Sequence, residues 1–254
     1  MDSPPPVALV TGGARRIGRA IVEDLAANGW AVAIHYNRSR DDAERLAAGI
    51  TASGGRAALV NGDFAEPECL KRLVHQAADA LGPPTLLVNN ASIFEPDQVG
   101  RLDRELWERQ MTVNLTAPIF LAEAFAAHVP DGVEGNIVNL LDQRIWKPTP
   151  RHFSYQISKS ALFVATETLA QALAPKIRVN GIAPGPVLKS SRQTEERFRR
   201  QAQAILLRRP PELADFGRTI RYLVATRSIT GQVIALDGGQ HLGWQTPDIA
   251  ATEE

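Results

Sequence analysis

The sequence predicts an α/β protein in which a doubly wound parallel sheet of seven strands carries helices on both faces. Short apolar runs rich in β-branched residues alternate with segments of helical periodicity, which is typical of strand–helix–strand units. Glycines close the first three helical segments, at Gly29, Gly54 and Gly82. With 254 residues the chain is long enough for one large domain with a single core.

The elements are expected in a regular order along the chain. The predicted strands are residues 7–10, 31–35, 57–61, 85–89, 136–141, 177–182 and 232–236. The predicted helices are residues 17–28, 41–53, 67–81, one long helix over 103–128, 155–174, and a last helix that ends near Val224. The charged segment 188–209 is interpreted as a helical insertion over the active site, at one end of the sheet. A folded domain is expected over 7–244, between a flexible N-terminus (1–6) and a C-terminal tail (245–254).

Composition excludes several classes of partner. Lys plus Arg and Asp plus Glu each number 28, so the formal net charge is zero and no overall field attracts nucleic acid or an anionic membrane. The single cysteine, Cys69, cannot form an internal disulfide or a thiolate cluster, which agrees with a reducing cytoplasm. No signal peptide or membrane-spanning run is found. We therefore expect a cytoplasmic protein with a small-molecule substrate and no metal site.

The segment TGGARRIG, residues 11–18, lies directly between the first strand and the first helix. Glycines there allow close approach of the backbone to a pyrophosphate, and the helix N-terminus supplies free N–H donors and a partial positive charge. A plain tight turn is the alternative. The position of the turn favours a Rossmann-like dinucleotide site.

The end of the second strand indicates which dinucleotide is bound. NAD sites usually place an acid there, whereas this strand ends in His35, Tyr36, Asn37, Arg38 and Ser39. A carboxylate would repel a 2′-phosphate, but Arg38 and Ser39 can bind one through a charge-assisted pair and a hydroxyl. NADPH is therefore the predicted cofactor. The alternative for Arg38 is a solvated residue at a strand end.

Tyr155 and Lys159 are four residues apart at the start of a predicted helix, so their side chains lie on one face. An ammonium close to a phenol lowers its pKa and prepares it for proton exchange. Together with the glycine-rich turn, the NNA at 89–91 and Asn114, this pair resembles the short-chain dehydrogenase/reductase family, from Val7 to about Leu242.

The resemblance implies an oxidoreductase, a homotetramer and a set of site residues. Asn114, Asp142, Tyr155 and Lys159 are the implied catalytic residues. The implied cofactor-binding residues are Gly12, Arg15, Arg16, Ile17, Gly18, His35, Tyr36, Asn37, Arg38, Ser39, Asp63, Phe64, Asn90, Ala91, Ser92, Tyr155, Lys159, Pro184 and Gly185.

Two positions depart from the family pattern. The usual second glycine of the phosphate turn is Arg16, and the usual catalytic serine is Asp142. The serine donates a hydrogen bond to a ketone oxygen that gains negative charge, whereas an ionised Asp accepts and would repel that oxygen. Asp142 suits instead a C=N substrate whose nitrogen takes up a proton. The alternative is a solvated loop acid.

This pattern resembles the pteridine reductase branch of the family, which includes the bacterial dihydromonapterin reductases. The branch carries the arginine in the turn, NNASIF, the spacing of the catalytic residues and the ending DGGQHL. It implies a pterin, or another flat heterocycle, that stacks on Phe94. The implied substrate-binding residues are Arg16, Ser92, Phe94, Asp142 and Tyr155.

Alternatives remain at each level. Phe94 is otherwise a core aromatic, and Ile93 replaces a serine that is common in the branch. Arg192 belongs to a solvated helical face or to a lid that senses an anionic substrate, and His241 and Trp244 line their own or a neighbouring pocket. The alternative functions are a general NADPH-dependent carbonyl reductase and a non-catalytic NADP(H)-binding sensor.

Overall fold

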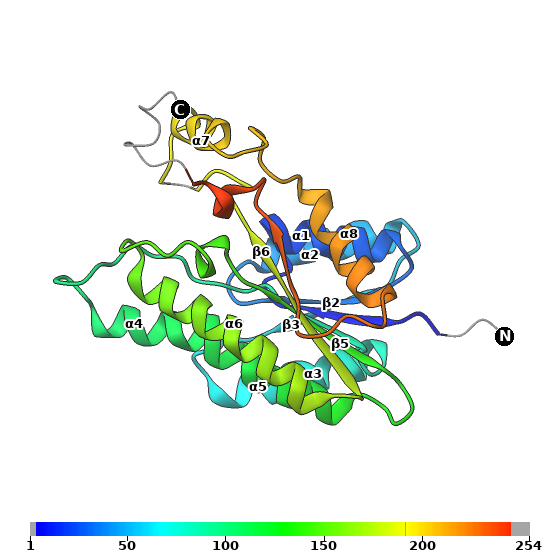
Figure 1. Cartoon of the computed structure of the whole chain (residues 1–254). Helices are drawn as coiled ribbons and strands as arrows, with labels where there is room; N and C mark the ends of the chain where they lie inside the picture. Colours follow the sequence, from blue (N-terminus) through cyan, green and yellow to red (C-terminus); the bar gives the residue numbers. More distant parts are fainter. Residues whose placement is uncertain (1–3, 191, 245–254) are drawn as a thin grey trace.

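The computed structural model describes residues 4–190 and 192–244, and its seven strands form one parallel sheet (Figure 1). The strand order is β3-β2-β1-β4-β5-β6-β7. The strands are β1 (Val7–Val10), β2 (Ala31–Tyr36), β3 (Ala57–Asn61), β4 (Leu86–Asn89), β5 (Gly135–Leu140), β6 (Ile177–Pro184) and β7 (Val233–Leu236). Four central strands, β1, β2, β4 and β5, are buried along their whole length, as expected for strands covered on both faces.

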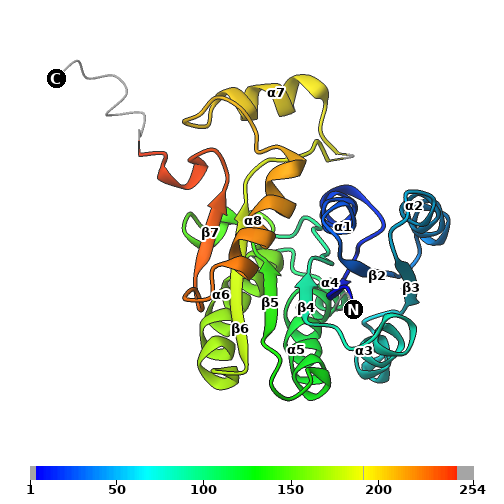
Figure 2. The ribbon, with the colours of Figure 1, turned by 90° about the vertical axis from the view of Figure 1, so that its right-hand side faces the viewer.

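Helices cover both faces of the sheet, which confirms the predicted fold class (Figure 2). One face carries α1 (Arg16–Ala27), α2 (Arg40–Ala52) and α8 (Leu213–Ala225), and the other carries α3 (Pro67–Leu81), α5 (Ala117–His128) and α6 (Phe153–Leu173). Two large apolar clusters fill the two interfaces. The core is therefore split into two layers by the sheet.

The direction of the strand order reverses between β1 and β4, which are direct neighbours. In open α/β sheets ligands bind at such a switch point, outside the carboxyl ends of the strands. The turn after β1, Asn90 after β4, Asp142 after β5 and Gly185 after β6 all lie at this edge. The topology alone thus brings together segments that are more than 170 residues apart.

The helix expected over 103–128 is not one regular α-helix. It consists of α4 (Arg104–Met111), a π-helical turn η1 (Thr112–Thr116) and α5. Pro118 has no N–H to donate to the carbonyl of Asn114, four residues earlier, so a regular hydrogen-bond ladder is interrupted there. The turn that results holds Asn114, and π-helical turns often occur at functional sites.

The segment after β6 leads to α7 (Glu195–Gln203), which lies beyond the carboxyl edge of the sheet (Figures 1 and 2). This place agrees with the predicted insertion, although Ser191 lies outside the described residues. So do the predicted C-terminal tail and the first three residues of the N-terminal segment. None of the described helices is long and apolar enough to cross a membrane.

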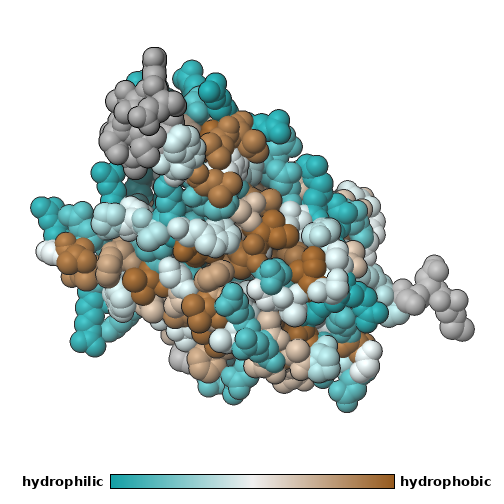
Figure 3. Space-filling view, in the orientation of Figure 1, coloured by the Kyte–Doolittle hydropathy of each residue, from teal (hydrophilic) through white to brown (hydrophobic). Residues whose placement is uncertain are grey.

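The face of the molecule that carries α6 shows apolar side chains between hydrophilic ones (Figure 3). On α6, Ile157 and Val164 are 38% and 56% exposed, and on the adjacent helix α5 Phe120 is 51% exposed. Ile157 and Val164 are seven residues apart, so they lie on the same side of α6. This group of three is called the α5/α6 face below.

Candidate active site

The turn after β1 requires its glycines. Gly12 has a φ of +59°, and a Cβ on Gly18 would lie 2.2 Å from the carbonyl oxygen of Gly12. The amide of Asn90 holds the turn from the other side, donating to the carbonyl oxygens of Thr11 and Gly12 at 2.8 and 3.1 Å. Helix α1 begins without a side-chain cap, so its first N–H groups are open to an anion. The turn therefore fits a pyrophosphate.

Arg16, at the position of the family's usual glycine, has a φ of +53°. This left-handed conformation is uncommon for a residue with a side chain and costs on the order of 1–3 kcal/mol. The guanidinium reaches across the cavity and donates to the carbonyl oxygens of Leu188 and Lys189 at 3.3 and 3.2 Å. Arg16 thus connects the phosphate turn to the segment that follows β6.

His35 lies beneath the turn. It is 3% exposed, its Nδ1 accepts from the N–H of Gly12 at 3.1 Å, and its Nε2 lies 3.1 Å from the carbonyl oxygen of Gly62. The ring stacks on Phe64 with centroids 4.7 Å apart. Burial lowers the pKa of His35 to about 4, so the ring is neutral at pH 7. The geometry shows a support for the turn, because both ring nitrogens are used by the backbone. The prediction that His35 belongs to the cofactor site stays a prediction, and its two nitrogens are already engaged.

The end of β2 offers an exposed cation. Arg38 is exposed, Ser39 is half-buried, and within the described chain neither side chain has a hydrogen-bond partner. Arg15, at the neighbouring turn, lies 3.5 Å from Asp42. Asp63, after β3, accepts from the N–H of Ala65 at 3.0 Å. Free donors at this corner fit a 2′-phosphate, since a charge-assisted bond needs a partner that is not already neutralised.

Tyr155 and Lys159 lie on α6 under the end of β5, where both are almost fully buried. The Tyr155 hydroxyl donates to Oδ2 of Asp142 at 2.9 Å. Lys159 Nζ donates to the carbonyl oxygen of Leu140 at 2.6 Å and lies 5.9 Å from the centre of the Tyr155 ring. Asp142 is thus a member of the site and not a solvated loop acid.

The expected effect of Lys159 on Tyr155 is not the dominant one. Burial, followed by the charge of Asp142 and the hydrogen bond to it, raises the pKa of the Tyr155 phenol well above its ordinary value. The guanidinium of Arg144 acts in the opposite direction. Burial also lowers the pKa of Lys159 to about 8, although Asp142 opposes this shift. The prediction of a lowered phenol pKa is wrong, because burial of the phenol and the carboxylate that replaces the serine both disfavour the phenolate.

Asn114, in the π-helical turn, connects three segments. Its Oδ1 accepts from the hydroxyl of Ser92 at 3.0 Å and from the N–H of Ile93 at 2.8 Å. Its Nδ2 donates to the carbonyl oxygen of Ile93 at 2.9 Å and to Ser158 at 3.1 Å. Asn114 therefore holds the loop after β4, which carries Phe94, against the helix of Tyr155.

Phe94 is half-buried in the wall of the site and is not a core aromatic. Its ring stacks on His152 at 4.1 Å between centroids and meets Tyr155 edge-on at 4.7 Å. Arg144 and Arg192 place their guanidinium carbons 5.2 and 5.9 Å from the ring centre. A planar substrate beside Phe94 would find an aromatic and cationic surface.

Two further groups were left open by the sequence. Arg192 is not merely solvated, because it forms an ion pair with Glu95 at 2.7 Å and donates to the carbonyl oxygen of Phe94. His241 does not line the cavity; its ring lies 2.7 Å from the buried carboxylate of Asp237 and 4.9 Å from the ring of Trp146. Trp244 is 64% exposed.

The sequence predicted no role for Arg144 or for His152. Arg144 stands two residues after Asp142, and this adjacency was the only signal available. His152 has a φ of +57°, directly before the catalytic helix, and its Nδ1 lies 3.1 Å from the carbonyl oxygen of Glu95.

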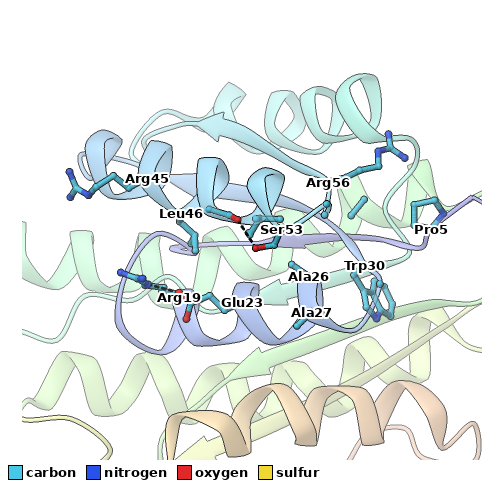
Figure 4. Close-up of a pocket in the computed structure, with 16 residues that line it drawn as sticks. Pro5, Arg19, Glu23, Ala26, Ala27, Trp30, Arg45, Leu46, Ser53 and Arg56 are labelled. Atoms are coloured by element: carbon cyan, nitrogen blue, oxygen red, sulfur yellow. Dashed lines mark hydrogen bonds and ion pairs between the residues drawn. The ribbon is translucent and has the colours of Figure 1, made fainter.

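The site encloses a cavity of about 410 Å³. Its lining includes Arg16, Asn90, Ser92, Phe94, Asp142, Arg144, His152, Tyr155, Lys159, Pro184, Gly185, Arg192 and Gln240. A larger cavity, of about 590 Å³, lies between α1 and α2 beside Trp30 and Arg56 and contains no predicted site residue (Figure 4). We take the smaller cavity as the site because it joins the turn, the phenol and the aromatic wall. In residues 4–190 and 192–244 no group of three His, Cys, Asp or Glu side chains is placed to hold a metal ion.

A dinucleotide turn joined to a buried Tyr–Lys pair at the carboxyl edge of a doubly wound sheet defines a class: oxidoreductases of the short-chain type. The family described as short chain dehydrogenase matches residues 6–200. The chain belongs to this family.

Relatives within the family are close in sequence and structure. FolM alternative dihydrofolate reductase 1 from Brucella suis, solved in complex with NADP, is 58% identical with a TM-score of 0.94, over 96% of this chain and 98% of that one. A blue fluorescent protein from a metagenomic library, in complex with NADPH, is 34% identical with a TM-score of 0.85, over 93% and 98%. A 3-oxoacyl-acyl-carrier-protein reductase from Synechocystis is 32% identical over 92% of this chain and 96% of that protein.

Proposed function

We propose that the protein is an NADPH-dependent reductase of a dihydropterin, to which it adds a hydride at the carbon of a C=N bond and a proton at the nitrogen. The observation that carries this proposal is the contact between Asp142 and Tyr155, 2.9 Å apart, in place of a serine hydroxyl. An ionised carboxylate at that point opposes an alkoxide, whereas the nitrogen of a C=N bond carries no negative charge once it has taken up the proton.

The residues that would hold the cofactor fit NADPH. Gly12 and Gly18 leave the backbone of the turn open, and Arg38 and Ser39 offer free donors where an acid would exclude a 2′-phosphate. The similarity to proteins solved with NADP or NADPH supports the same choice. When bound, the cofactor supplies the hydride.

The substrate class follows from the wall of the cavity. Phe94, flanked by His152 and two guanidinium groups, suits a flat ring system, and stacking on an aromatic side chain contributes about 1–3 kcal/mol for related bases. The relative from Brucella suis, which is described as an alternative dihydrofolate reductase, supports a pterin ring. Ser92 and Arg16 lie at the same cavity and would contact the ring or the cofactor.

The proposed chemistry balances with one hydride and one proton. As carbon accepts the hydride, the π electrons of the C=N bond move to nitrogen, which takes the proton of the Tyr155 hydroxyl. Lys159 stabilises the phenolate that is left, and Asn114 supports a water relay that returns a proton from solvent. Asp142 holds the phenol protonated until the substrate is bound.

We also infer a cytoplasmic homotetramer. Its support is the family resemblance, together with the exposed apolar α5/α6 face, which is a suitable surface for another copy of the chain.

The test is a substrate panel followed by one substitution. The parent protein should oxidise NADPH in the presence of a dihydropterin. Asp142→Ser rebuilds a donor, so kcat/KM for the dihydropterin should fall about 100-fold while activity on a simple ketone appears or rises. Asp142→Asn, which keeps size and removes charge, should lower dihydropterin reduction to a similar, still measurable extent without gaining activity on the ketone.

Three results would contradict the proposal. An unchanged ratio of dihydropterin to ketone activity in Asp142→Ser would favour a general carbonyl reductase, as would ketone reduction by the parent alone. Tight NADPH binding without turnover of any substrate would favour a sensor.

A further inference from the structure

We propose that Arg144 is a positioning residue that compensates the charge of Asp142, so that Tyr155 can release its proton beside a carboxylate. The inference rests on the proposed role of Tyr155 as proton donor. It assigns a function to a side chain that the family motifs leave unassigned.

Arg144 contacts Asp142 through both its backbone and its side chain. The N–H of Arg144 donates to Oδ1 at 2.9 Å, and its Nη1 donates to Oδ2 at 3.0 Å. Oδ2 is the atom that also accepts from the Tyr155 hydroxyl. The two donors therefore share one carboxylate oxygen, and the guanidinium lies one hydrogen bond from the group that transfers the proton.

The position of Arg144 is fixed from several sides. It lies in the short 3₁₀ turn η2 (Gln143–Ile145), which Asp142 caps. Its carbonyl oxygen accepts from Nε2 of Gln156 on α6 at 3.0 Å, which connects the turn to the catalytic helix. The side chains of Arg144 and Asp142 are only 24% and 15% exposed, so solvent screens their interaction less than that of a surface pair.

Counting charges shows why a second cation is needed. After Tyr155 has given up its proton, a site with a serine holds a phenolate and the Lys159 ammonium, and their charges sum to zero. With Asp142 in place of the serine, the same state carries one net negative charge in a buried place, which is costly. Arg144 restores the sum to zero.

Other basic side chains face the cavity but do not touch Asp142. They are Arg16 of α1, Arg192 after β6 and His152 before α6, whose pKa is lowered by burial. Arg16 donates to backbone carbonyls and Arg192 is paired with Glu95, so their charges are engaged elsewhere. Lys159 donates to Leu140. Arg144 is the guanidinium bound to the carboxylate itself, and its charge is the one that opposes the raised pKa of Tyr155.

The test is a double-mutant cycle with Arg144→Gln and Asp142→Asn. Arg144→Gln alone should lower kcat about 10- to 100-fold, as for a lost charge-assisted bond, with the Kd for NADPH unchanged. The Asp142→Asn background has no carboxylate charge to compensate, so Arg144→Gln should lower kcat there by less than about threefold. Arg144→Lys keeps the charge and should retain more activity than Arg144→Gln.

Arg192→Gln is the matched control, since it removes another guanidinium beside Phe94 that does not touch Asp142. Its effect should be the same in both backgrounds. The solvent isotope effect on kcat should rise in Arg144→Gln, because proton release from Tyr155 becomes slower. If Arg144 had a purely structural role, the isotope effect would not change.

A measurement without substrate separates this inference from the proposed function. Tyrosinate absorbance, taken as the difference between each protein and its Tyr155→Phe form, follows the phenol alone. Arg144→Gln should move this titration to higher pH, because a cation that lowers the pKa is lost. If the parent did not turn over a dihydropterin, the proposed function would be contradicted. The titration would still show whether Arg144 lowers the pKa of Tyr155. Equal losses in both backgrounds of the cycle, or an unmoved titration, would overturn the role of Arg144.

Discussion

At the residue scale, Arg38 and Tyr155 are the side chains proposed to select the cofactor and to donate the proton. Arg38 is exposed at the end of β2 without a partner in the described chain, whereas Tyr155 is 6% exposed and hydrogen-bonded to Asp142. An exposed free cation is available to an incoming anion, and a buried phenol exchanges its proton only with the groups placed around it. The two residues therefore allow separate tests of binding and of catalysis.

Arg38→Asp should narrow or reverse a preference for NADPH over NADH. One charge-assisted pair with a 2′-phosphate contributes about 1.5–3 kcal/mol, and the new carboxylate would repel that group. The ratio of the two dissociation constants, measured by fluorescence titration, checks this. Equal affinities for both cofactors in the parent would show that Arg38 does not select the phosphate.

Tyr155→Phe should leave the Kd for NADPH nearly intact and lower turnover by about two to four orders of magnitude, the range of a lost general acid. Single-turnover kinetics with a dihydropterin measures the loss. A variant that keeps most of the parent's rate would mean that the proton comes from another group.

At the scale of elements, one irregular turn and one buried side chain of a regular strand support the site. The π-helical turn between α4 and α5 places Asn114 against the Ser92–Ile93 loop, and the buried ring of His35 joins the turn after β1 to Gly62 after β3. Both features connect segments that are distant in sequence. The π-helical turn fixes the loop that carries Phe94, and the His35 ring fixes the glycine-rich turn after β1.

His35 should make stability depend on pH between its two pKa values. The pKa is about 4 in the folded protein and 6.5 unfolded, so the unfolded chain binds the proton first as pH falls. The neutral, buried His35 ring therefore contributes fully to the free energy of unfolding above pH 6.5. About 3 kcal/mol of this free energy is lost as the pH falls to about 4. Urea unfolding of the parent and of His35→Gln across this range gives the comparison. The variant should show a shallower pH dependence, and identical slopes would exclude His35 as the cause.

At the scale of the whole molecule, the sheet order decides which segments meet. β5 lies between β4 and β6, so the loop with Phe94, the turn with Asp142 and the segment after Pro184 open onto one cavity. The opposite side of α6 is the apolar α5/α6 face. The same helix thus carries the catalytic pair inward and exposed apolar side chains outward.

The α5/α6 face should form part of a tetramer interface. The parent should have a mass near four times 27.6 kDa in light scattering, and Val164→Asp should lower it, since burying an unpaired charge in an apolar contact is unfavourable. Val133→Asp, at an exposed apolar residue in the loop between α5 and β5 that is not part of this group of three, is the control and should keep the parent's mass. A monomeric parent would contradict the inferred assembly.

The sequence by itself determined the fold class, the order of the strands along the chain, the glycine-rich turn and the common face of Tyr155 and Lys159. These depend on local periodicity and on residues a few positions apart, which are visible in one dimension. The seven-stranded sheet confirms the fold class and the strand order, and Tyr155 and Lys159 both line the cavity. The departure from the family pattern also indicated that Asp142 lies by Tyr155, and their hydrogen bond confirms this.

Only the tertiary structure decided the contact of Asp142 with Arg144, the stacking of His152 on Phe94, and the engagement of both nitrogens of His35 beneath the turn. The π-helical turn was missed because helical periodicity does not register one altered turn. The direction of the Tyr155 pKa shift was wrong because it depends on burial and on the carboxylate 2.9 Å away. Such effects arise from distances between segments that the chain brings together only when the sheet has formed.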